Sequence, residues 1–322
     1  MKILITGAAG FIGYHLTKAL LTAGHTVVGV DNFCDENYPS ALKHARVQDI
    51  YKTFPNCEPI EELDVCNWLS LEEVFTTHPD IEVVIHLAAT PSVQYSIQNP
   101  YHVLENNISG MHNVLEACKE FKISQLLFAS SSSVYGNYKA PVATADKAQP
   151  VNIYGVSKRT NELQAAAYST MYGMNVTGMR FFNVYGEWGR PDSAIFKFTK
   201  AILANQPIEV RGDGSMTRGY TYVGDVVQSI LALLDLQLKD WHLINVGGQH
   251  PCTLDTFIHT LYNVIGASSD IHRVPKLSGE IDCIYSDNRG MLCNTPLEEG
   301  ITKFVTWYKT IYSLINQLNT IQ

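Results

Sequence analysis

The sequence lacks the features that mark membrane proteins, disulfide-rich domains and zinc proteins. No apolar run approaches the ~18 residues that a membrane-spanning helix needs. The cysteines number seven, which is odd, and form no CxxC pair, while the 11 histidines form no HxxxH pair. We therefore expect no membrane partner, no disulfide scaffold and no metal site, and interpret the cysteines as reduced thiols of a cytoplasmic protein.

A basic excess is also missing. The chain carries 31 acidic residues against 23 lysines and arginines, a formal net charge of −8, which argues against nucleic acid as a partner. Charged residues make up only 17% and hydrophobic residues 46%, so the chain can bury a sizeable core. Its 322 residues suggest about two domains, or one large α/β unit with an appendage.

The first residues contain a lysine and an apolar stretch, as a secretion signal would. Glycines interrupt that stretch, however, and no small-x-small cleavage site follows an unbroken helix. The better interpretation is a buried strand over Lys2–Thr6, a turn over Gly7–Gly13, and a helix over Phe11–Ala23 that ends at Gly24.

Strand-like and helix-like segments then alternate along the first half of the chain. Such alternation predicts βαβ units, and hence an α/β fold with a Rossmann-type doubly wound parallel sheet and helices on both faces. Further strands are expected at His25–Val30, Ile60–Leu63, Glu82–Ala88, Gln125–Ser130 and Val176–Phe182, and helices at about 67–78, 98–121 and 152–172.

After about residue 183 the pattern becomes loop-rich, which favours a smaller α/β cap. We expect 183–219 and 247–322 to form this cap, and about 220–246 to return to the domain formed by 1–182. The expected elements are helices near 193–205, 223–238 and 253–265, and strands near 208–211 and 242–246.

The turn Gly7–Gly13 has the glycine spacing of a dinucleotide-binding loop. Glycines at i, i+3 and i+6 permit a tight turn, let backbone N–H groups approach a pyrophosphate, and allow the following helix to pack on the strand. Asp31 ends the second strand, where a carboxylate accepts hydrogen bonds from a ribose 2′-hydroxyl and repels a 2′-phosphate. This favours NAD over NADP; the alternative is that Asp31 merely caps a strand. Asp64 is a second candidate for contacting the adenine.

Tyr154 and Lys158 are spaced to lie on one face of a helix. A nearby ammonium and a cationic nicotinamide would both favour the phenolate, so this tyrosine can take or return a hydroxyl proton while hydride moves to a cofactor. A solvated helix face is the alternative interpretation. Ser131, Ser132 and Ser133 follow a predicted strand, where they either face a ligand at the carboxyl end of the sheet or form a serine-rich turn.

Together these segments resemble the extended short-chain dehydrogenase/reductase family, and within it the nucleotide-sugar epimerases. The resemblance runs from Met1 to about Leu236, with a weaker tail. Within the epimerases the sequence is most similar to the UDP-glucuronate 4-epimerases, through Asp31–Arg46 and Trp188–Asp192. The matching motifs are TGAAGFIG at 6–13, HLAA at 86–89, NNISG at 106–110, SSSSVYG at 130–136, YGVSK at 154–158 and RFFNVYG at 180–186.

The resemblance implies an isomerase with tightly bound NAD that converts UDP-glucuronate to UDP-galacturonate through a transient 4-keto sugar. Tyr154 would be the general base and acid, Lys158 would lower its pKa and bind the nicotinamide ribose, and Ser131 would hydrogen-bond the reacting 4-hydroxyl. The larger domain would bind NAD and the cap would bind the UDP-sugar. A homodimer through the helices near 98–121 and 152–172 is also implied.

The remaining site residues are likewise implied by the resemblance. NAD would be held by Gly7, Gly10, Phe11, Ile12, Gly13, Asp31, Asn32, Asp64, Val65, Leu87, Ala88, Ala89, Asn107, Tyr154 and Lys158. The sugar and diphosphate would be contacted by Ser132, Ser133, Asn183, Arg190, Arg211 and Arg218. The three arginines suit an acidic protein that must hold a diphosphate.

Two departures from the glucuronate enzymes leave the sugar open. Asn183 stands where those enzymes carry a threonine, and Gln94 where they tend to carry an arginine. Both changes weaken a carboxylate site, so a 4-epimerase of a neutral UDP-sugar, UDP-glucose or UDP-N-acetylglucosamine, is the alternative. The segment 287–297 is also shorter than is usual and should lack a small helix beside the pocket.

Other reaction types are disfavoured. Ser132 and Ser133 stand where related 4,6-dehydratases carry Asp-Glu, and related decarboxylases carry Glu at the position of Ser133. A dinucleotide-sensing regulator without turnover usually loses the tyrosine or the lysine, and both are present. A keto-sugar reductase would consume NADH or NADPH, and Asp31 disfavours NADPH.

Overall fold

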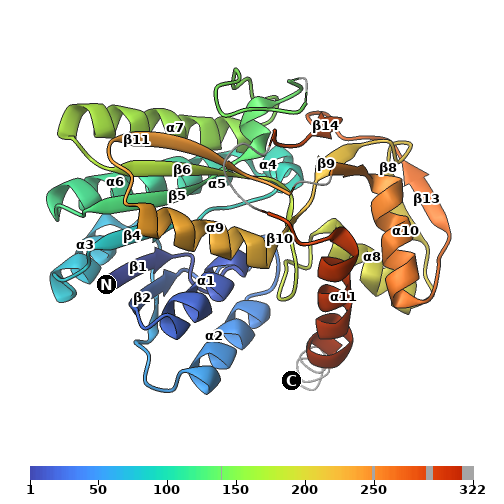
Figure 1. Cartoon of the computed structure of the whole chain (residues 1–322), viewed down its shortest axis with the longest axis horizontal. Helices are drawn as coiled ribbons and strands as arrows, with labels where there is room; N and C mark the ends of the chain where they lie inside the picture. Colours follow the sequence, from blue (N-terminus) through green and yellow to red (C-terminus); the bar gives the residue numbers. More distant parts are fainter. Residues whose placement is uncertain (139, 249–250, 288–292, 314–322) are drawn as a thin grey trace.

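The computed structural model describes residues 1–138, 140–248, 251–287 and 293–313. Its centre is a seven-stranded sheet with the strand order β11-β6-β5-β4-β1-β2-β3, in which every pair of neighbours is parallel (Figure 1). From β1 the chain winds outward in one direction through β2 and β3, and then in the other from β4. A crevice for a ligand opens at the carboxyl ends of the strands where the winding reverses. The doubly wound α/β fold predicted from the sequence is confirmed.

The bounds of the elements follow the chain. The strands of the large sheet are β1 (Lys2–Thr6), β2 (Thr26–Asp31), β3 (Ile60–Glu62), β4 (Val83–His86), β5 (Gln125–Ser131), β6 (Val176–Phe181) and β11 (Trp241–Val246). The α-helices are α1 (Phe11–Thr22), α2 (Ala41–Thr53), α3 (Trp68–Thr77), α4 (Val93–Gln98), α5 (Pro100–Leu104), α6 (Gly110–Glu120), α7 (Ile153–Tyr172), α8 (Ala194–Leu203), α9 (Val223–Leu236), α10 (Leu254–Ile265) and α11 (Leu297–Trp307).

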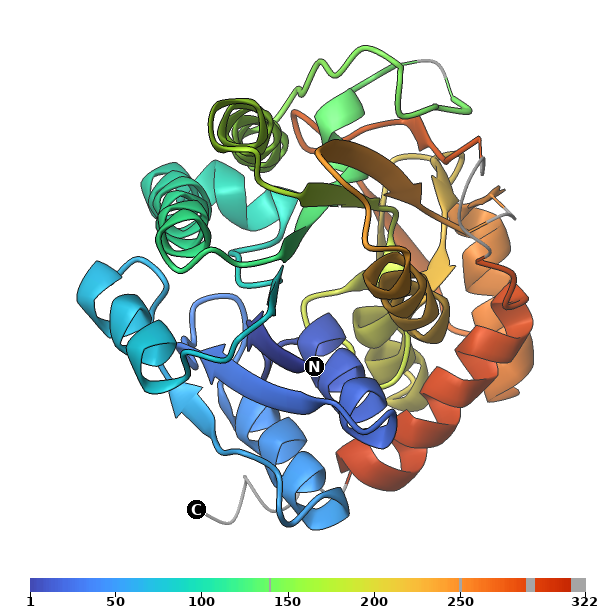
Figure 2. The same ribbon diagram turned by 60° about the vertical axis from the view of Figure 1, so that its left-hand side comes forward.

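Helices cover both faces of the sheet (Figure 2). Alternating apolar side chains of the strands supply a core on each of these faces. Leu4 of β1 belongs to the core that α3, α6 and α7 cover, while its neighbours Ile3 and Ile5 belong to the core under α1 and α9. Because successive side chains of a strand point to opposite faces, continuously apolar strands must be buried on both sides. This explains why the sequence of β1 contains no polar alternation.

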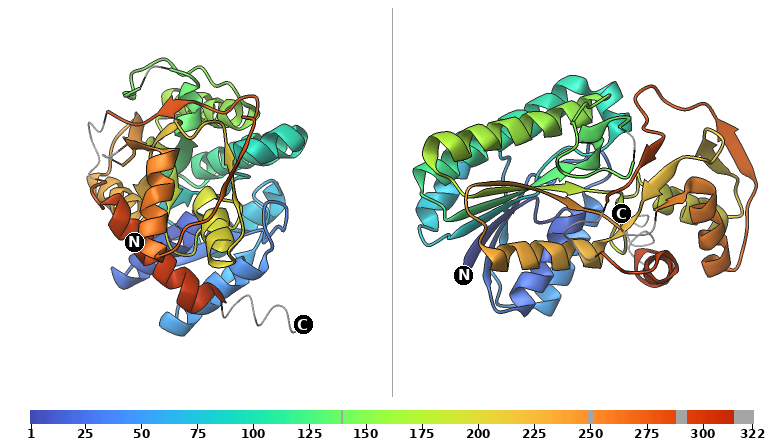
Figure 3. Two further views of the ribbon diagram at one scale, coloured as in Figure 1. Left: turned by 90° about the vertical axis from the view of Figure 1, so that its right-hand side faces the viewer. Right: turned by 45° about the horizontal axis from the view of Figure 1, so that its top comes forward.

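Among the other described residues, three small sheets and the helices α8, α10 and α11 lie around a third core (Figure 3). This core joins Phe196, Phe257 and Phe304 to Leu42 and Ile50 of α2, so it ties α2 to the outlying helices. The small sheets contain β7 (Val184–Tyr185) with β10 (Thr221–Tyr222), β8 (Ile208–Arg211) with β13 (Ile271–Val274), and β9 (Thr217–Gly219) with β12 (Pro251–Thr253) and β14 (Cys283–Ile284).

The helix predicted over about 98–121 is confirmed over residues 100–120, where α5, a π-helical turn over Glu105–Ser109 and α6 follow one another without a break. The short helix α4 precedes it and was not predicted. Pro100 occupies the first turn of α5, since it has no backbone N–H to continue α4. Helices α2 and α11 were not predicted. Of the shortened segment 287–297, residues 288–292 lie outside the described residues.

Two simpler expectations concern cysteines and membrane spans. The seven cysteines lie in the described residues, and each is a free thiol. Among the helices of the described ranges, none is both long and apolar enough to cross a membrane.

Candidate active site

A cavity of about 400 Å³ lies at the carboxyl ends of the central strands. Its walls come from the turn after β1, the end of β2, the ends of β4 and β5, the start of α7, and the segment after β6. Among the residues predicted for the site, the structure brings these to its lining: Gly7, Gly10, Phe11, Ile12, Gly13, Asp31, Asn32, Val65, Leu87, Ala88, Ala89, Ser131, Ser132, Ser133, Tyr154, Lys158, Asn183 and Arg190.

The turn between β1 and α1 is a close-packed cradle. Gly7 has a φ of +75°, and a Cβ on Gly13 would lie 2.1 Å from the Gly7 carbonyl oxygen. A side chain at either position would therefore displace the turn. Gly10 is the N-cap of α1, which places the positive end of that helix at the cavity. These features fit a dinucleotide pyrophosphate.

Asp31 lies at the edge of the cavity beside a lysine that sequence reasoning missed. Lys43 of α2 donates a hydrogen bond of 3.0 Å to Asp31 Oδ1, and both side chains are buried. Burial lowers the pKa of Lys43, but the charge and hydrogen bond of Asp31, together with the neighbouring Cys34 and Tyr38, raise the pKa overall. Asp31 also accepts a 2.9 Å bond from the backbone of Phe33, so its carboxylate is held in a fixed position.

The start of α7 is packed tightly against the serines that follow β5. A Cβ on Gly155 would lie 2.6 Å from the Ser133 carbonyl oxygen, so only glycine allows this approach. The Asn152 side chain caps the helix by accepting a 2.8 Å bond from the Gly155 N–H. As a result Tyr154 and Ser131 are held together.

Tyr154 is a neutral phenol in this environment. Burial raises its pKa, while a hydrogen bond with the Ser131 hydroxyl and the charge of Arg190 lower it in part. Its side chain nevertheless reaches the cavity lining. The phenol therefore lies where it can exchange a proton with a bound hydroxyl group.

Lys158 lies one turn along α7 and is also buried at the cavity. Burial lowers its pKa to about 8. Its ammonium donates a 3.0 Å hydrogen bond to the Ala129 carbonyl oxygen of β5. An ammonium has three donors, so this bond leaves others for a ligand. The chief opposing influences on the pKa of Tyr154 are Ser131 and Arg190, so an effect of Lys158 on that pKa stays a prediction.

A buried ionic cluster further along α7 helps to fix this helix against the sheet. Glu162, on the same face of α7, pairs with Arg180 of β6 through bonds of 2.7 and 2.8 Å, and accepts a 2.6 Å bond from Ser130 of β5. Burial raises the pKa of Glu162, but its bond and charge interaction with Arg180 lower the pKa overall. The cluster fixes α7 relative to β5 and β6.

The opposite wall carries the residues expected to contact a sugar. Asn183 has a φ of +27°, a conformation that asparagine tolerates better than most residues, and it lines the cavity. Arg190 is held by a bidentate pair with Asp192, at 3.0 and 2.9 Å, and its side chain is 23% exposed. It is the arginine among the three predicted that reaches the cavity lining.

Four predicted residues do not line the cavity. Asp64 is exposed at its rim and accepts a 3.3 Å bond from Asn32. Asn107 is buried and joins the Thr90 backbone to Ser157, whereas the adjacent Asn106 lines the cavity, so a contact of Asn107 with NAD stays a prediction. The sequence feature that could have identified Asn106 is the pair of adjacent asparagines. A π-helical turn directs their side chains differently from an α-helix.

Arg211 and Arg218 lie on the small sheets away from that lining. Arg211 is within 3.5 Å of Glu209 and 3.9 Å of Glu280. Arg218 donates to backbone carbonyl oxygens, including those of Thr217 and Asp282, and burial lowers its pKa. Their contact with a sugar or diphosphate stays a prediction.

Sequence reasoning also missed Arg46, a buried residue of α2. Its guanidinium donates to Ala9 in the glycine turn at 2.9 Å, to Tyr38 at 2.9 Å and to the Trp188 carbonyl oxygen at 2.6 Å. It therefore joins the glycine turn to the segment that carries Arg190. Because α2 was not predicted, nothing in the sequence placed Lys43 or Arg46 beside the cavity.

Comparisons with known proteins agree with this arrangement. Residues 3–247 match the model of the NAD dependent epimerase/dehydratase family. The chain is 33% identical to the UDP-glucuronate 4-epimerase of Thermodesulfobacterium geofontis, over 98% of each chain, and 34% identical to a probable UDP-glucuronate 4-epimerase of Rhizobium meliloti, over 97% of this chain and 98% of that one. The crystal structure of the Bacillus cereus UDP-glucuronic acid 4-epimerase with UDP-glucuronic acid and NAD has a TM-score of 0.90 at 31% identity, and covers 99% of this chain and 100% of that one.

Proposed function

The chain belongs to the NAD dependent epimerase/dehydratase family, and from this we propose that it is an NAD-dependent isomerase that converts UDP-glucuronate to UDP-galacturonate by epimerisation at C4. The observation that carries the proposal is the joint position of Tyr154, Lys158 and Ser131 in one cavity with the glycine turn. The sugar is taken from relatives named for UDP-glucuronate and from the structure with that sugar bound.

The cofactor site fits NAD by its own chemistry. The cradle at Gly7 and Gly13 has room for a pyrophosphate and not for side chains, and Asp31 is a buried carboxylate at the place where a ribose 2′-hydroxyl would lie. When bound, NAD supplies reversible hydride transfer at C4 of the sugar. The net reaction is an isomerisation, because the hydride returns to the sugar.

Tyr154 is the proposed acid and base. As the phenolate, which the positive charges of a bound nicotinamide ring and of Lys158 would favour, it removes the proton of the C4 hydroxyl. The phenol formed in this way returns that proton to the 4-keto oxygen after the sugar has turned in the cavity. Ser131, which hydrogen-bonds Tyr154, orients that same hydroxyl. Lys158 keeps a positive charge beside the phenol when protonated and binds a ribose with its remaining donors.

The sugar nucleotide is the proposed ligand of the opposite wall. Arg190 is a fixed cation in an acidic protein, so it suits the diphosphate or the uronate carboxylate. Ser132, Ser133 and Asn183 offer neutral hydrogen-bonding groups to the sugar hydroxyls. Asn183 and Gln94 replace groups expected to favour a carboxylate, so the neutral UDP-sugars are the substrates to test against UDP-glucuronate.

We further propose a homodimer formed through α7 and its neighbours. This helix carries exposed apolar side chains at Val156 (39%), Leu163 (56%) and Met171 (67%), and Tyr101 on the adjacent α5 is 89% exposed. Large apolar side chains gathered on one face favour burial against a partner. The free cysteines support a cytoplasmic location.

The division of labour between two parts of the chain is also a proposal. We assign NAD binding to 1–182 with about 220–246, and binding of the UDP-sugar to 183–219 with 247–322. The large sheet, including β11, supports the first assignment, and the position of Arg190 supports the second.

The test is to incubate the protein with a panel of UDP-sugars and to identify the products by NMR. The purified protein, without added NAD, is incubated separately with UDP-glucuronate, UDP-glucose and UDP-N-acetylglucosamine, and the anomeric protons of the products are monitored. We expect UDP-galacturonate from UDP-glucuronate and no net change in absorbance at ~340 nm, the absorption band of reduced nicotinamide. A C4 epimer formed only from a neutral sugar would overturn the choice of substrate, and stoichiometric oxidation of NADH would overturn the isomerase.

A further inference from the structure

A segment after β2, which we call the strap (residues Asn32–Ser40), runs along the edge of the cavity next to Asp31. Cys34, Asn37 and Tyr38 of the strap line the cavity. The side of the cavity that faces the strap, which we call the opposite bank, is formed by Pro91–Val93 and by Asn106. A ligand held at Asp31 therefore lies between the strap and this bank.

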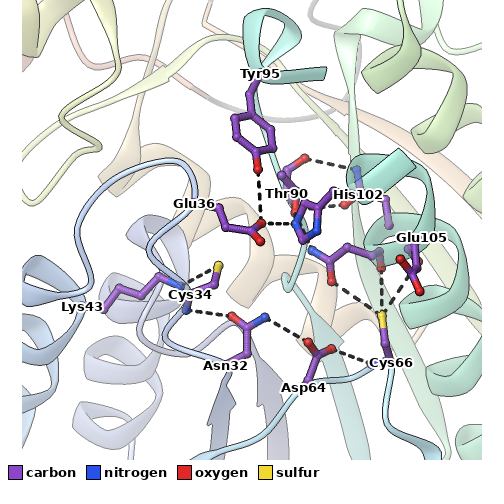
Figure 4. Close-up of polar contacts among 12 residues, drawn as sticks. Asn32, Cys34, Glu36, Lys43, Asp64, Cys66, Thr90, Tyr95, His102 and Glu105 are labelled. Carbon is purple, nitrogen blue, oxygen red and sulfur yellow. Dashed lines mark hydrogen bonds and ion pairs between the residues drawn. The ribbon is translucent and has the colours of Figure 1, made fainter. Parts of the chain in front are cut away.

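The strap is connected to the opposite bank by side chains (Figure 4). Glu36 lies between Tyr95 of α4 and His102 of α5. Its carboxylate contacts the Nε2 atom of His102, an ion pair when the imidazole is protonated, and accepts a 3.3 Å hydrogen bond from the Tyr95 hydroxyl. His102 also lies 3.2 Å from the Thr90 hydroxyl, which accepts a 2.6 Å bond from Asn106. The contact of Glu36 thus continues into the bank that lines the cavity.

The end of the strap near Tyr38 is held more firmly than this connection. At the base, the Tyr38 hydroxyl accepts a bond from Arg46, and Arg46 is fully buried. Glu36 and His102, by contrast, have side chains that are 41% and 34% exposed. An exposed ion pair contributes little and breaks readily, whereas buried polar contacts persist. The connection through Glu36 is therefore the part of the strap suited to open and close.

We propose that Glu36 and His102 are positioning residues that hold the strap closed over the bound dinucleotide and so slow its release between turnovers. The inference rests on the proposed function for the identity of that ligand. An epimerase regenerates NAD in each cycle, so NAD need not leave for the next substrate to react. Closure over the adenosine end therefore retains the cofactor without impeding the sugar, which enters by the opposite wall.

The experiment measures NAD release from the full chain. Protein loaded with radiolabelled NAD is mixed with excess unlabelled NAD, and the label that remains bound is counted over time. In Glu36→Gln the amide keeps the shape of the side chain and loses the charge that pairs with His102. We expect NAD to leave about threefold to fivefold faster, the effect of an exposed ion pair.

A matched control is available on the same domain. Glu61 of β3 pairs with His78 at 3.8 Å, has a 44% exposed side chain and does not line the cavity. Glu61→Gln should release NAD at the rate of the unmodified protein. The charge-swapped double variant Glu36→His with His102→Glu should recover slow release, which loss of stability alone would not do.

Three outcomes would overturn the inference: unchanged release in Glu36→Gln, equal acceleration in Glu61→Gln, or failure of the charge swap to slow release relative to Glu36→Gln. The measurement needs no sugar, so it is separate from the test of the reaction. If no UDP-sugar is converted but Glu36→Gln releases NAD faster, the proposed function fails and the inference holds. Absence of NAD binding overturns both.

Discussion

Lys43 and Asp31 form a buried ion pair, 3.0 Å from ammonium to carboxylate, at the lining of the cavity. Asp31 balances the charge of Lys43, and its remaining lone pairs are the proposed acceptors for a ribose. The pair also places a cation next to the carboxylate that is expected to reject a 2′-phosphate. The proposed preference for NAD over NADP thus depends on keeping Asp31 charged beside Lys43.

Asp31→Asn should weaken NAD binding and reduce the preference over NADP. Hydrogen bonds to a charged group contribute about 1.5–3 kcal/mol, so the affinity for NAD should fall roughly 10- to 100-fold. Lys43, freed from its partner, should attract the 2′-phosphate and raise the affinity for NADP. Titration calorimetry with both dinucleotides measures the two effects; unchanged affinity for NAD would show that Asp31 only caps β2.

Tyr154→Phe should abolish most of the turnover and leave NAD bound. The substitution removes the hydroxyl that exchanges the C4 proton, and general acid–base catalysis contributes about 10²- to 10⁴-fold. The control is Tyr168→Phe on the same helix, whose hydroxyl bonds Glu116 outside the cavity. Conversion of UDP-glucuronate is followed by NMR for both variants, and undiminished turnover in Tyr154→Phe would exclude the proposed mechanism.

The lowered pKa of Lys158 predicts a particular dependence of stability on pH. Burial lowers this pKa from 10.5 to about 8, so between these values the unfolded chain binds a proton that the folded chain does not. The destabilising contribution of Lys158 is therefore full below pH 8 and disappears as the pH rises to about 10.5.

Lys158→Met, compared with the unmodified protein, isolates this contribution. In nucleotide-free protein the variant should be more stable at pH 7, and its advantage should shrink as the pH rises from 8 to 10.5. Urea unfolding at several pH values measures the difference in free energy of unfolding, in which groups common to both proteins cancel. An advantage that is constant with pH would mean that Lys158 keeps an ordinary pKa in the fold.

The glycine turn and the start of α7 could be predicted from the sequence, because each is formed by residues that lie close together in the chain. The glycine spacing over Gly7–Gly13 defines a turn, and the four-residue spacing of Tyr154 and Lys158 defines a helix face, so each is visible in a short window. Both patterns agree with the observed lining of the cavity. β1 likewise matches its predicted bounds, since an uninterrupted apolar run fits a strand buried on both faces.

The missed residues depend on tertiary contacts. α2 has a weak apolar pattern because its Lys43 and Arg46 are buried by polar partners, and buried cations look like surface positions in a sequence. Asn106, for which the sequence predicted no role, lines the cavity in place of Asn107 because a π-helical turn adds a residue to that turn of helix. Arg211 and Arg218 were placed at the ligand by resemblance alone: the strand near 208–211 was predicted, but its pairing with β13 in a small sheet depends on tertiary contacts.

Breaking the buried pair of Glu162 and Arg180 should lower the free energy of unfolding. Glu162→Leu leaves the Arg180 charge buried without its partner, which costs about 3–5 kcal/mol of the free energy of unfolding. Arg180→Met should cost less, because Arg159 still pairs with Glu162 at 2.9 Å. The double variant Glu162→Leu with Arg180→Met should lose less than the sum of the two, because neither charge remains. Urea unfolding of all three variants measures the coupling, and strict additivity would show that the pair does not interact energetically.

The exposed face of α7 leads to a last prediction, which concerns the oligomeric state of the protein. Leu163 lies in the middle of the helix with 56% of its surface exposed, flanked along the same helix by Val156 and Met171. If this face is the interface of a dimer, a carboxylate at its centre is buried without a partner, and that penalty exceeds what the surrounding apolar contacts can offset. Sedimentation velocity should show a dimer for the unmodified chain and a monomer for Leu163→Asp. Leu236→Asp, at a 60% exposed position on α9, introduces the same charge elsewhere and should remain dimeric. A monomeric unmodified chain would remove the proposed dimer, and dissociation by Leu236→Asp would move the interface to the opposite face of the sheet.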